Sequence, residues 1–165
     1  MREAVIVSTA RTPIGKAYRG SFNNTHAQTL AGHAISEAVK RAKVDPYDVD
    51  DVILGAAAQQ GTQQGNIARQ SLLRAGLPTS VAGMSIDRQC ASGMMAIATA
   101  AKQIIADGMN ITVGGGVESV SLVRNENFRM DNARDPWLEN EMPELYMTMI
   151  ETAETVADRY GISRE

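Results

Sequence analysis

The sequence of 165 residues contains a single cysteine, and aromatic side chains make up only 4% of it. One cysteine cannot form an intramolecular disulfide, which excludes the disulfide-rich secreted scaffolds. The 16 basic and 19 acidic side chains give a net charge of -3, without the basic excess that drives binding to nucleic acid or acidic membranes. No run approaches the roughly 20 apolar residues that a transmembrane helix needs. We therefore expect a folded cytoplasmic protein that binds neither nucleic acid nor membrane.

Apolar residues alternate between strand-like and helix-like spacing over the first 120 positions. The pattern predicts strands over 4–8, 52–54, 81–87 and 111–113, and helices over 25–43, 66–75 and 90–107. Asn24 or Thr25 is expected to cap the first helix, and Asn66 the second. Strands joined by crossover helices favour a mostly parallel sheet covered on both faces, so the predicted fold class is α/β.

The character of the chain changes after Val123. Residues 124–144 hold the only tryptophan, two prolines and many charges, and we expect an irregular excursion or lid over a site. Helical spacing returns over 146–160, and Gly161 is expected to end that helix. Residues 163–165 (Ser-Arg-Glu) resemble the start of a further helix, which favours a piece of a longer protein.

Cys90 is the residue best placed for chemistry. The expected strand over 81–87 leads through a short polar turn to Cys90, which is predicted to lie in the first turn of the next helix. A helix N-terminus has unpaired amides and a partial positive charge, which favour the thiolate of a nucleophilic cysteine and a developing oxyanion. The helix behind Cys90 is apolar nearly all round, which predicts that it is buried in the centre of the protein.

Other interpretations of these residues stay open at this point. A lone cysteine in an intracellular protein is more often an inert small apolar residue than a nucleophile. A nucleophile also needs a base, and His26 and His33 project from the polar face of their helix, opposite its apolar stripe. The two histidines and the distant Cys90 do not have the spacing of zinc ligands, so no metal site is expected.

Two glycine-containing segments resemble phosphate-binding loops only in part. Residues 15–17 (Gly-Lys-Ala) lack the upstream glycine of a phosphate loop and the Ser or Thr that would bind magnesium. Residues 114–116 are three glycines without the spacing of a dinucleotide-binding loop, and we interpret them as a close approach between two backbones. The residues that would bind a cofactor remain unassigned.

Six segments form a pattern that covers essentially the whole chain. They are Ala-Arg-Thr-Pro-Ile-Gly-Lys at 10–16, Gly-Asn-Ile-Ala-Arg-Gln at 65–70, Gln-Cys-Ala-Ser-Gly-Met at 89–94, Gly-Gly-Gly-Val-Glu-Ser at 114–119, Thr-Ala-Glu-Thr-Val-Ala at 152–157 and Gly-Ile-Ser-Arg-Glu at 161–165. In content and order they resemble the thiolase family, enzymes of acetyl-CoA and 3-ketoacyl-CoA chemistry. The segments at 89–94 and 114–119 are the most specific.

The resemblance implies a five-layered αβαβα fold built from two similar halves. Residues 1–121 would form the N-terminal α/β domain, and 122–165 would begin the loop domain that covers CoA. Cys90 would be the nucleophile that accepts the acyl group, with CoA and acyl-CoA as substrates and no cofactor. The family's activating His, second Cys and oxyanion-binding Asn belong to the second half, so this chain alone is expected to be inactive. A homodimer or homotetramer is also implied.

The chain departs from the acetoacetyl-CoA-specific members at one place. Many of these have His-Met-Gly before the Thr-Ala-Glu segment, where this chain has Thr148, Met149 and Ile150. The difference favours a broader 3-ketoacyl-CoA thiolase of fatty acid metabolism over an acetoacetyl-CoA (biosynthetic) thiolase. A non-catalytic thiolase-like module that binds CoA or lipid is the alternative from another class. The decarboxylating condensing enzymes of the same superfamily are disfavoured because their Cys segments differ.

Overall fold

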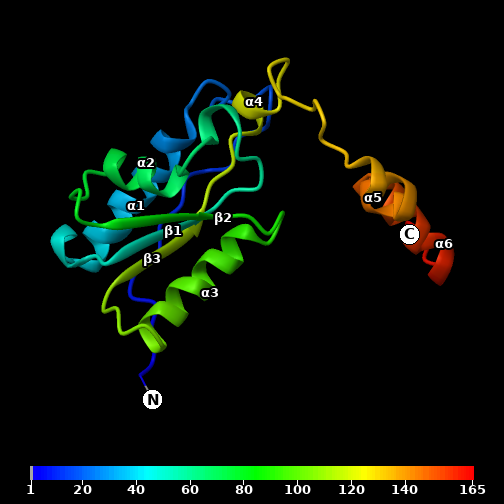
Figure 1. Ribbon diagram of the computed structural model, residues 1–165. Helices are drawn as coiled ribbons and strands as arrows, with labels where there is room; N and C mark the ends of the chain where they lie inside the picture. The colour runs from blue at the N-terminus through cyan, green and yellow to red at the C-terminus, as the bar shows by residue number, and fades with distance from the viewer. Residues whose placement is uncertain (1) are drawn as a thin grey trace. The chain divides into compact units, whose positions relative to one another are not determined.

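The computed structural model describes residues 2–165, which fold as two compact units (Figure 1). One unit ends at Phe128, and the other spans Arg129–Glu165. The first contains a sheet with helices on both faces, and the second contains only short helices. The domain boundary expected after residue 121 stays a prediction. None of the helices over residues 2–165 is both long enough and apolar enough to span a membrane.

The first unit is built on a parallel sheet of three strands. These are β1 (Asp51–Gly55), β2 (Ala82–Ile86) and β3 (Thr112–Gly116), in the order β2-β1-β3. Ile53 in the central strand lies opposite Met84 on one side and Gly114 on the other. All five residues of β1 are buried, as expected for a central strand covered on both faces. The three later strands of the sequence prediction are confirmed.

Two helices cover one face of this sheet and one helix covers the other (Figure 1). The helices α1 (Ala27–Ala42) and α2 (Ile67–Arg74) lie on the first face, and α3 (Ser92–Ile105) lies on the second. Val52 and Leu54 of β1 join the core cluster with α1 and α2, whereas Ile53 packs with α3. This alternation follows from the two-residue period of a strand, and it confirms the predicted α/β class.

One of the two predicted helix caps is correct. Asn66 caps α2, with its Oδ1 accepting a hydrogen bond from the Arg69 amide at 3.0 Å. The prediction of Asn24 or Thr25 for α1 is wrong, since the N-cap is His26 and no side chain caps that helix. The reason is local: the Thr25 amide bonds to the Phe22 carbonyl in a preceding turn, so the helix begins two residues later.

The strand predicted over residues 4–8 does not form. These residues are in no strand, and Val5, Ile6 and Val7 are each more than two-thirds exposed. The sheet of the described residues ends at β2 on one side and at β3 on the other, and residues 4–8 pair with neither of these edge strands. A β-branched composition favours a strand only where the backbone pairs with a neighbour, so composition alone was not a sufficient signal here.

The second unit is more regular than expected over residues 124–144, where we predicted an irregular excursion. That stretch contains α5 (Pro136–Glu141) and the start of a 3-10 turn, η3 (Pro143–Tyr146). The helix predicted over 146–160 is confirmed as α6 (Met149–Tyr160). Asp135 caps α5, where a proline occupies the first turn, so this short helix has ordinary start signals that the sequence analysis missed. Gly161 ends α6 in the left-handed conformation, as predicted.

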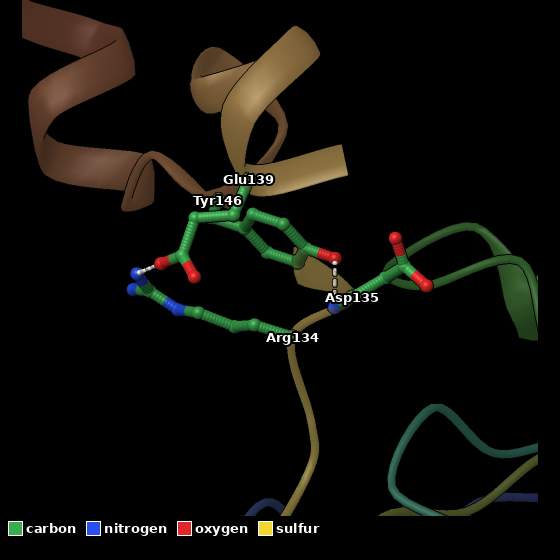
Figure 2. A network of polar contacts seen from close by, with 4 residues as sticks. All are labelled: Arg134, Asp135, Glu139 and Tyr146. Carbon is green, nitrogen blue, oxygen red and sulfur yellow. Dashed lines mark hydrogen bonds and ion pairs between the residues drawn. The ribbon is translucent and has the colours of Figure 1, made fainter. Parts of the chain in front are cut away.

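Figure 2 shows the polar contacts that join α5 to the turn before α6. The Arg134 guanidinium donates to Glu139 Oε1 at 2.8 Å and lies 5.3 Å from the centre of the Tyr146 ring. The Tyr146 hydroxyl accepts a hydrogen bond from the Asp135 amide at 2.9 Å. These contacts hold the second unit together largely through polar and ring interactions, because none of its helices has a fully buried residue.

Candidate functional site

Cys90 lies in the turn between β2 and α3, at the carboxyl end of the sheet, and it is exposed. The expectation that it occupies the first turn of the helix is wrong, because α3 begins at Ser92 with Ala91 as its N-cap. Gln89 adopts a left-handed conformation with a φ of 48°, which bends the chain between the strand and the helix. Cys90 therefore immediately precedes the N-cap of α3, with the helix N-terminus beside it.

Ser92 organises the backbone on both sides of Cys90. Its hydroxyl accepts a hydrogen bond from the Arg88 amide at 2.8 Å and donates one to the Gln89 carbonyl at 2.6 Å. The Asp87 carboxylate accepts a hydrogen bond from the Gln89 amide at 2.7 Å. Ser92 is buried although it is polar, since its hydroxyl is satisfied within the turn. These contacts fix the position of the backbone that carries Cys90.

Three glycines bring the sheet against the N-terminus of α3. A Cβ atom on Gly55 would collide with the backbone of Ser92, and one on Gly116 would lie 3.2 Å from the Cα of Gly93. A Cβ on Gly114 would lie 2.8 Å from the Cα of Ile97, further along the helix. The interpretation of residues 114–116 as a close approach of two backbones is therefore confirmed. The carboxyl ends of β1 and β3 therefore pack against the start of α3, which follows the Cys90 turn.

A cluster around Glu118 joins the segments that follow β1 and β3. Its carboxylate accepts hydrogen bonds from the amides of Ala57 at 2.9 Å and Ala58 at 3.4 Å, and from the side-chain amide of Gln63. Gln63 is fully buried, and its Oε1 accepts a hydrogen bond from the Ser119 amide. The sequence analysis did not assign a role to Gln63. The only signal that could have indicated one is its place in a polar loop rich in glutamine.

The helix behind Cys90 is buried on one face only. Ala96 and Ala100 pack against Ile53 of the sheet, whereas Met94 is 75% exposed and Ile97 is 49% exposed. The prediction of a helix buried on all sides is therefore wrong for the structure of residues 2–165. The sheet can cover only one face of α3, and the other apolar face has no covering element in the described part of the chain.

Neither histidine is positioned to act on Cys90. His26 occupies the N-cap position of α1 and His33 lies within that helix, which covers the face of the sheet opposite α3, and both histidines are exposed. Within residues 2–165, no three side chains of the His, Cys, Asp and Glu types come together as metal ligands. Of the catalytic groups that the thiolase resemblance implies, namely two cysteines, a histidine and an asparagine, only Cys90 is identified among the described residues.

A cavity of about 360 Å³ lies beside the Glu118 cluster in the first unit. Its walls are residues 10–17, part of α1 and residues 116–121. Residues 10–16 and residues 116–119, which are far apart in the sequence and belong to two of the six segments, therefore line the same cavity.

The segment at 65–70 makes polar contacts with its surroundings. Gln28 of α1 and Gln70 of α2 are joined by a side-chain hydrogen bond, and Gln70 also binds the carbonyl of Gln64. The motif at 65–70 is thus tied to the loop before it.

Comparison with known proteins assigns the chain to a family. Residues 4–165 match the family described as Thiolase, N-terminal domain. The chain belongs to the thiolase family. The resemblance seen in the six sequence segments is therefore confirmed. The fold agrees as well, since a crystal structure of the Bacillus anthracis acetyl-CoA acetyltransferase matches 99% of this chain with a TM-score of 0.81 and 38% identity.

Similar thiolases are considerably longer than this chain. A 3-ketoacyl-CoA thiolase of Bacillus subtilis is 41% identical over an alignment of 167 positions, which covers 100% of this chain and 42% of that protein. An acetyl-CoA acetyltransferase of Cupriavidus necator is 39% identical over 100% of this chain and 44% of its own length. The 165 residues thus span less than half the length of these thiolases. The five-layered arrangement of two halves stays a prediction.

Proposed function

We propose that this thiolase chain carries the acyl-accepting nucleophile of an acyl-CoA acyltransferase, and that this nucleophile is Cys90. The observation that supports the proposal is the place of Cys90 within a match to the thiolase N-terminal domain. It is the only cysteine of the sequence, and it is exposed. It lies beside a helix N-terminus, in a turn that is held by hydrogen bonds of the Ser92 hydroxyl. An inert core cysteine would be buried, whereas this sulfur is open to a substrate.

In the degradative direction, the thiolate of Cys90 attacks the keto carbon of a 3-ketoacyl-CoA. The bond between the α and keto carbons then breaks, and its electron pair stays on the α carbon of the departing acetyl-CoA, which takes up a proton. The acyl group remains as a thioester on Cys90 until the thiolate of free CoA attacks it and displaces the Cys90 sulfur. Condensation of acetyl-CoA runs through the same bonds in reverse.

The residues of this chain provide part of the machinery that these steps need. The partial positive charge at the N-terminus of α3 favours negative charge that develops next to Cys90. The acid and base for the α carbon and the thiols are not identified in residues 2–165. We infer that they lie in the second half of a thiolase, and that residues 1–165 alone bind or accept an acyl group without sustained turnover.

The acyl-chain preference that we propose is a broad one. Thr148 caps α6, and Met149 and Ile150, which follow it, are 74% and 76% exposed. These side chains present apolar surface where many acetoacetyl-CoA-specific thiolases have His-Met-Gly. We therefore favour 3-ketoacyl-CoA substrates of fatty acid metabolism over acetoacetyl-CoA alone. A cytoplasmic homodimer or homotetramer belongs to the same proposal.

Acylation by acetyl-CoA tests the role of Cys90 directly. A thiolase that contains residues 1–165 together with a second half is incubated with acetyl-CoA, quenched in acid and digested, and the peptides are analysed by mass spectrometry. We expect one acetyl group on the peptide that contains Cys90 and none in a Cys90→Ala variant. Acetylation at another residue, or acyl transfer that persists in Cys90→Ala, would exclude the proposal. Tight binding of CoA without any acetylation would favour the non-catalytic CoA-binding alternative.

A further inference from the structure

We propose that Glu118 is a positioning residue for Cys90, acting through the carboxyl ends of β1 and β3. The proposal rests on the proposed function, because the position of Cys90 matters only if its sulfur reacts. Glu118 makes no hydrogen bond to the Cys90 turn in the described structure. Its effect is transmitted by the backbone segments that it holds together.

The carboxylate of Glu118 is the point at which two strand ends are joined. Three N–H donors converge on it, from Ala57, Ala58 and the buried side chain of Gln63. Ala57 follows the last residue of β1 by two positions, and Glu118 follows the last residue of β3 by two. Gln63 strengthens this connection because it also binds the Ala58 carbonyl at 2.8 Å and the Ser119 amide.

The joined strand ends determine where the Cys90 turn lies. The Val117 amide donates to the Gly55 carbonyl at 3.0 Å, so the ends of β3 and β1 stay paired beyond the strands. Gly55 and Gly116 touch the backbone of Ser92 and Gly93 without a side chain between them. A shift of either strand end is therefore passed to Ser92, whose hydroxyl holds the amide of Arg88 and the carbonyl of Gln89.

A carboxylate suits this position better than an amide of the same size. An ionised carboxylate has only acceptor sites, and hydrogen bonds to a charged acceptor are stronger than those between neutral groups. In Glu118→Gln, one oxygen is replaced by an NH₂ group that faces N–H donors. At least one of the three donors then loses its partner, and the strand ends are free to separate.

Amide hydrogen exchange in the native protein tests this coupling at single residues. In Glu118→Gln, we expect the amides of Ala91 and Ser92, which bond to the carbonyls of Arg88 and Gln89, to exchange about tenfold faster. The amides of α1 should keep their protection. The matched control is Glu126→Gln, which removes the same charge from an exposed position in the same unit. This variant should exchange like the unsubstituted protein.

A second control separates positioning from a loss of overall stability. Val39→Ala removes buried apolar volume from α1, on the other face of the sheet, so it should speed exchange throughout the unit. Unchanged exchange at Ala91 and Ser92 in Glu118→Gln, or a uniform increase like that of Val39→Ala, overturns the proposal. If Glu118→Gln does not fold, Gln63→Met, which removes the Gln63 donor to Glu118 together with its contacts to the Ala58 carbonyl and the Ser119 amide, is compared in the same way, with the same two outcomes.

Acetylation of Cys90 completes the test. We expect Glu118→Gln to be labelled by acetyl-CoA about tenfold more slowly, because a displaced nucleophile reaches the attacking geometry less often. Equal labelling rates in Glu118→Gln and the unsubstituted protein would overturn the positioning role. A protein without any labelling at Cys90 would instead contradict the proposed function, and the exchange rates alone would then decide whether Glu118 orders the turn.

Discussion

The backbone of Gly55, at the end of β1, lies directly against the backbone of Ser92, at the start of α3. No side chain fits between the two, so the last residue of the central strand sets how closely the helix behind Cys90 approaches the sheet. The two residues are 37 positions apart in the sequence. Their contact explains why a glycine ends an otherwise continuous run of larger apolar residues.

Gly55→Ala should therefore destabilise the first unit. The added Cβ would overlap the Ser92 backbone, which has no flexible side chain that could move aside. We expect a loss of about 3 kcal/mol or more in the free energy of unfolding, measured by urea denaturation. Gly115→Ala is the matched control, because its Cβ would make an ordinary contact of 3.6 Å with Leu54 and should cost less than about 1.5 kcal/mol. Similar losses for both variants would contradict the proposed steric cause.

Ser92→Ala should loosen the turn that carries Cys90. The substitution removes the acceptor of the Arg88 amide and a donor to the Gln89 carbonyl. An unsatisfied, partly buried amide costs about 1–3 kcal/mol, so we expect a loss of that size in urea denaturation. The control is Ser80→Ala, an exposed serine that should change stability by less than about 0.5 kcal/mol. A neutral effect of Ser92→Ala would show that the hydroxyl does not hold the turn.

Asn66→Asp should separate two roles of the residue that caps α2. The aspartate keeps the oxygen that accepts from the Arg69 amide but loses the NH₂ that donates to the Gly83 carbonyl at 2.7 Å. Asn66→Ala loses both contacts, together with the oxygen that accepts from the Ser85 hydroxyl at 3.0 Å, and should cost about 1–2 kcal/mol. We expect Asn66→Asp to retain part of that stability in thermal unfolding measured by circular dichroism. Equal losses in the two variants would assign the whole effect to the contact with β2.

The start of α6 should depend on pH through Glu151. Hydrogen bonds from the amide and hydroxyl of Thr148, both at 2.8 Å, lower the pKa of the Glu151 carboxyl below its ordinary value of 4.5, with a smaller contribution from the charge of Arg134. The stabilisation is therefore complete above that ordinary value and disappears as the pH falls through the lowered pKa.

Carbon-detected NMR titration of the Glu151 carboxyl measures this shift. We expect the Thr148→Ala variant to return the Glu151 pKa towards 4.5, and Arg134→Gln to raise it by a smaller amount. A Glu151 pKa that is insensitive to Thr148→Ala would show that the Thr148 hydroxyl does not bind the carboxylate in solution, since the alanine variant keeps the backbone amide.

The order of the main elements could be read from the sequence, and Cys90 could be proposed as the nucleophile, because both inferences depend on local signals. Apolar spacing placed the three strands and the main helices, and Asn66 and Gly161 marked helix ends through contacts within a few residues. Cys90 stood out because a strand, a turn and a helix follow one another there. The motif segments identified the family for the same reason, since each is contiguous in the chain.

Only the tertiary structure decided which of these local tendencies were realised. Residues 4–8 have the composition of a strand but pair with none of the three strands in the described structure, and α3 is apolar on a face that the sheet does not cover. The Glu118 carboxylate finds its three donors near residues 57–63, far away in the sequence. Such contacts depend on which strand ends lie side by side in the folded protein. A local pattern of residues does not determine which distant segments become neighbours.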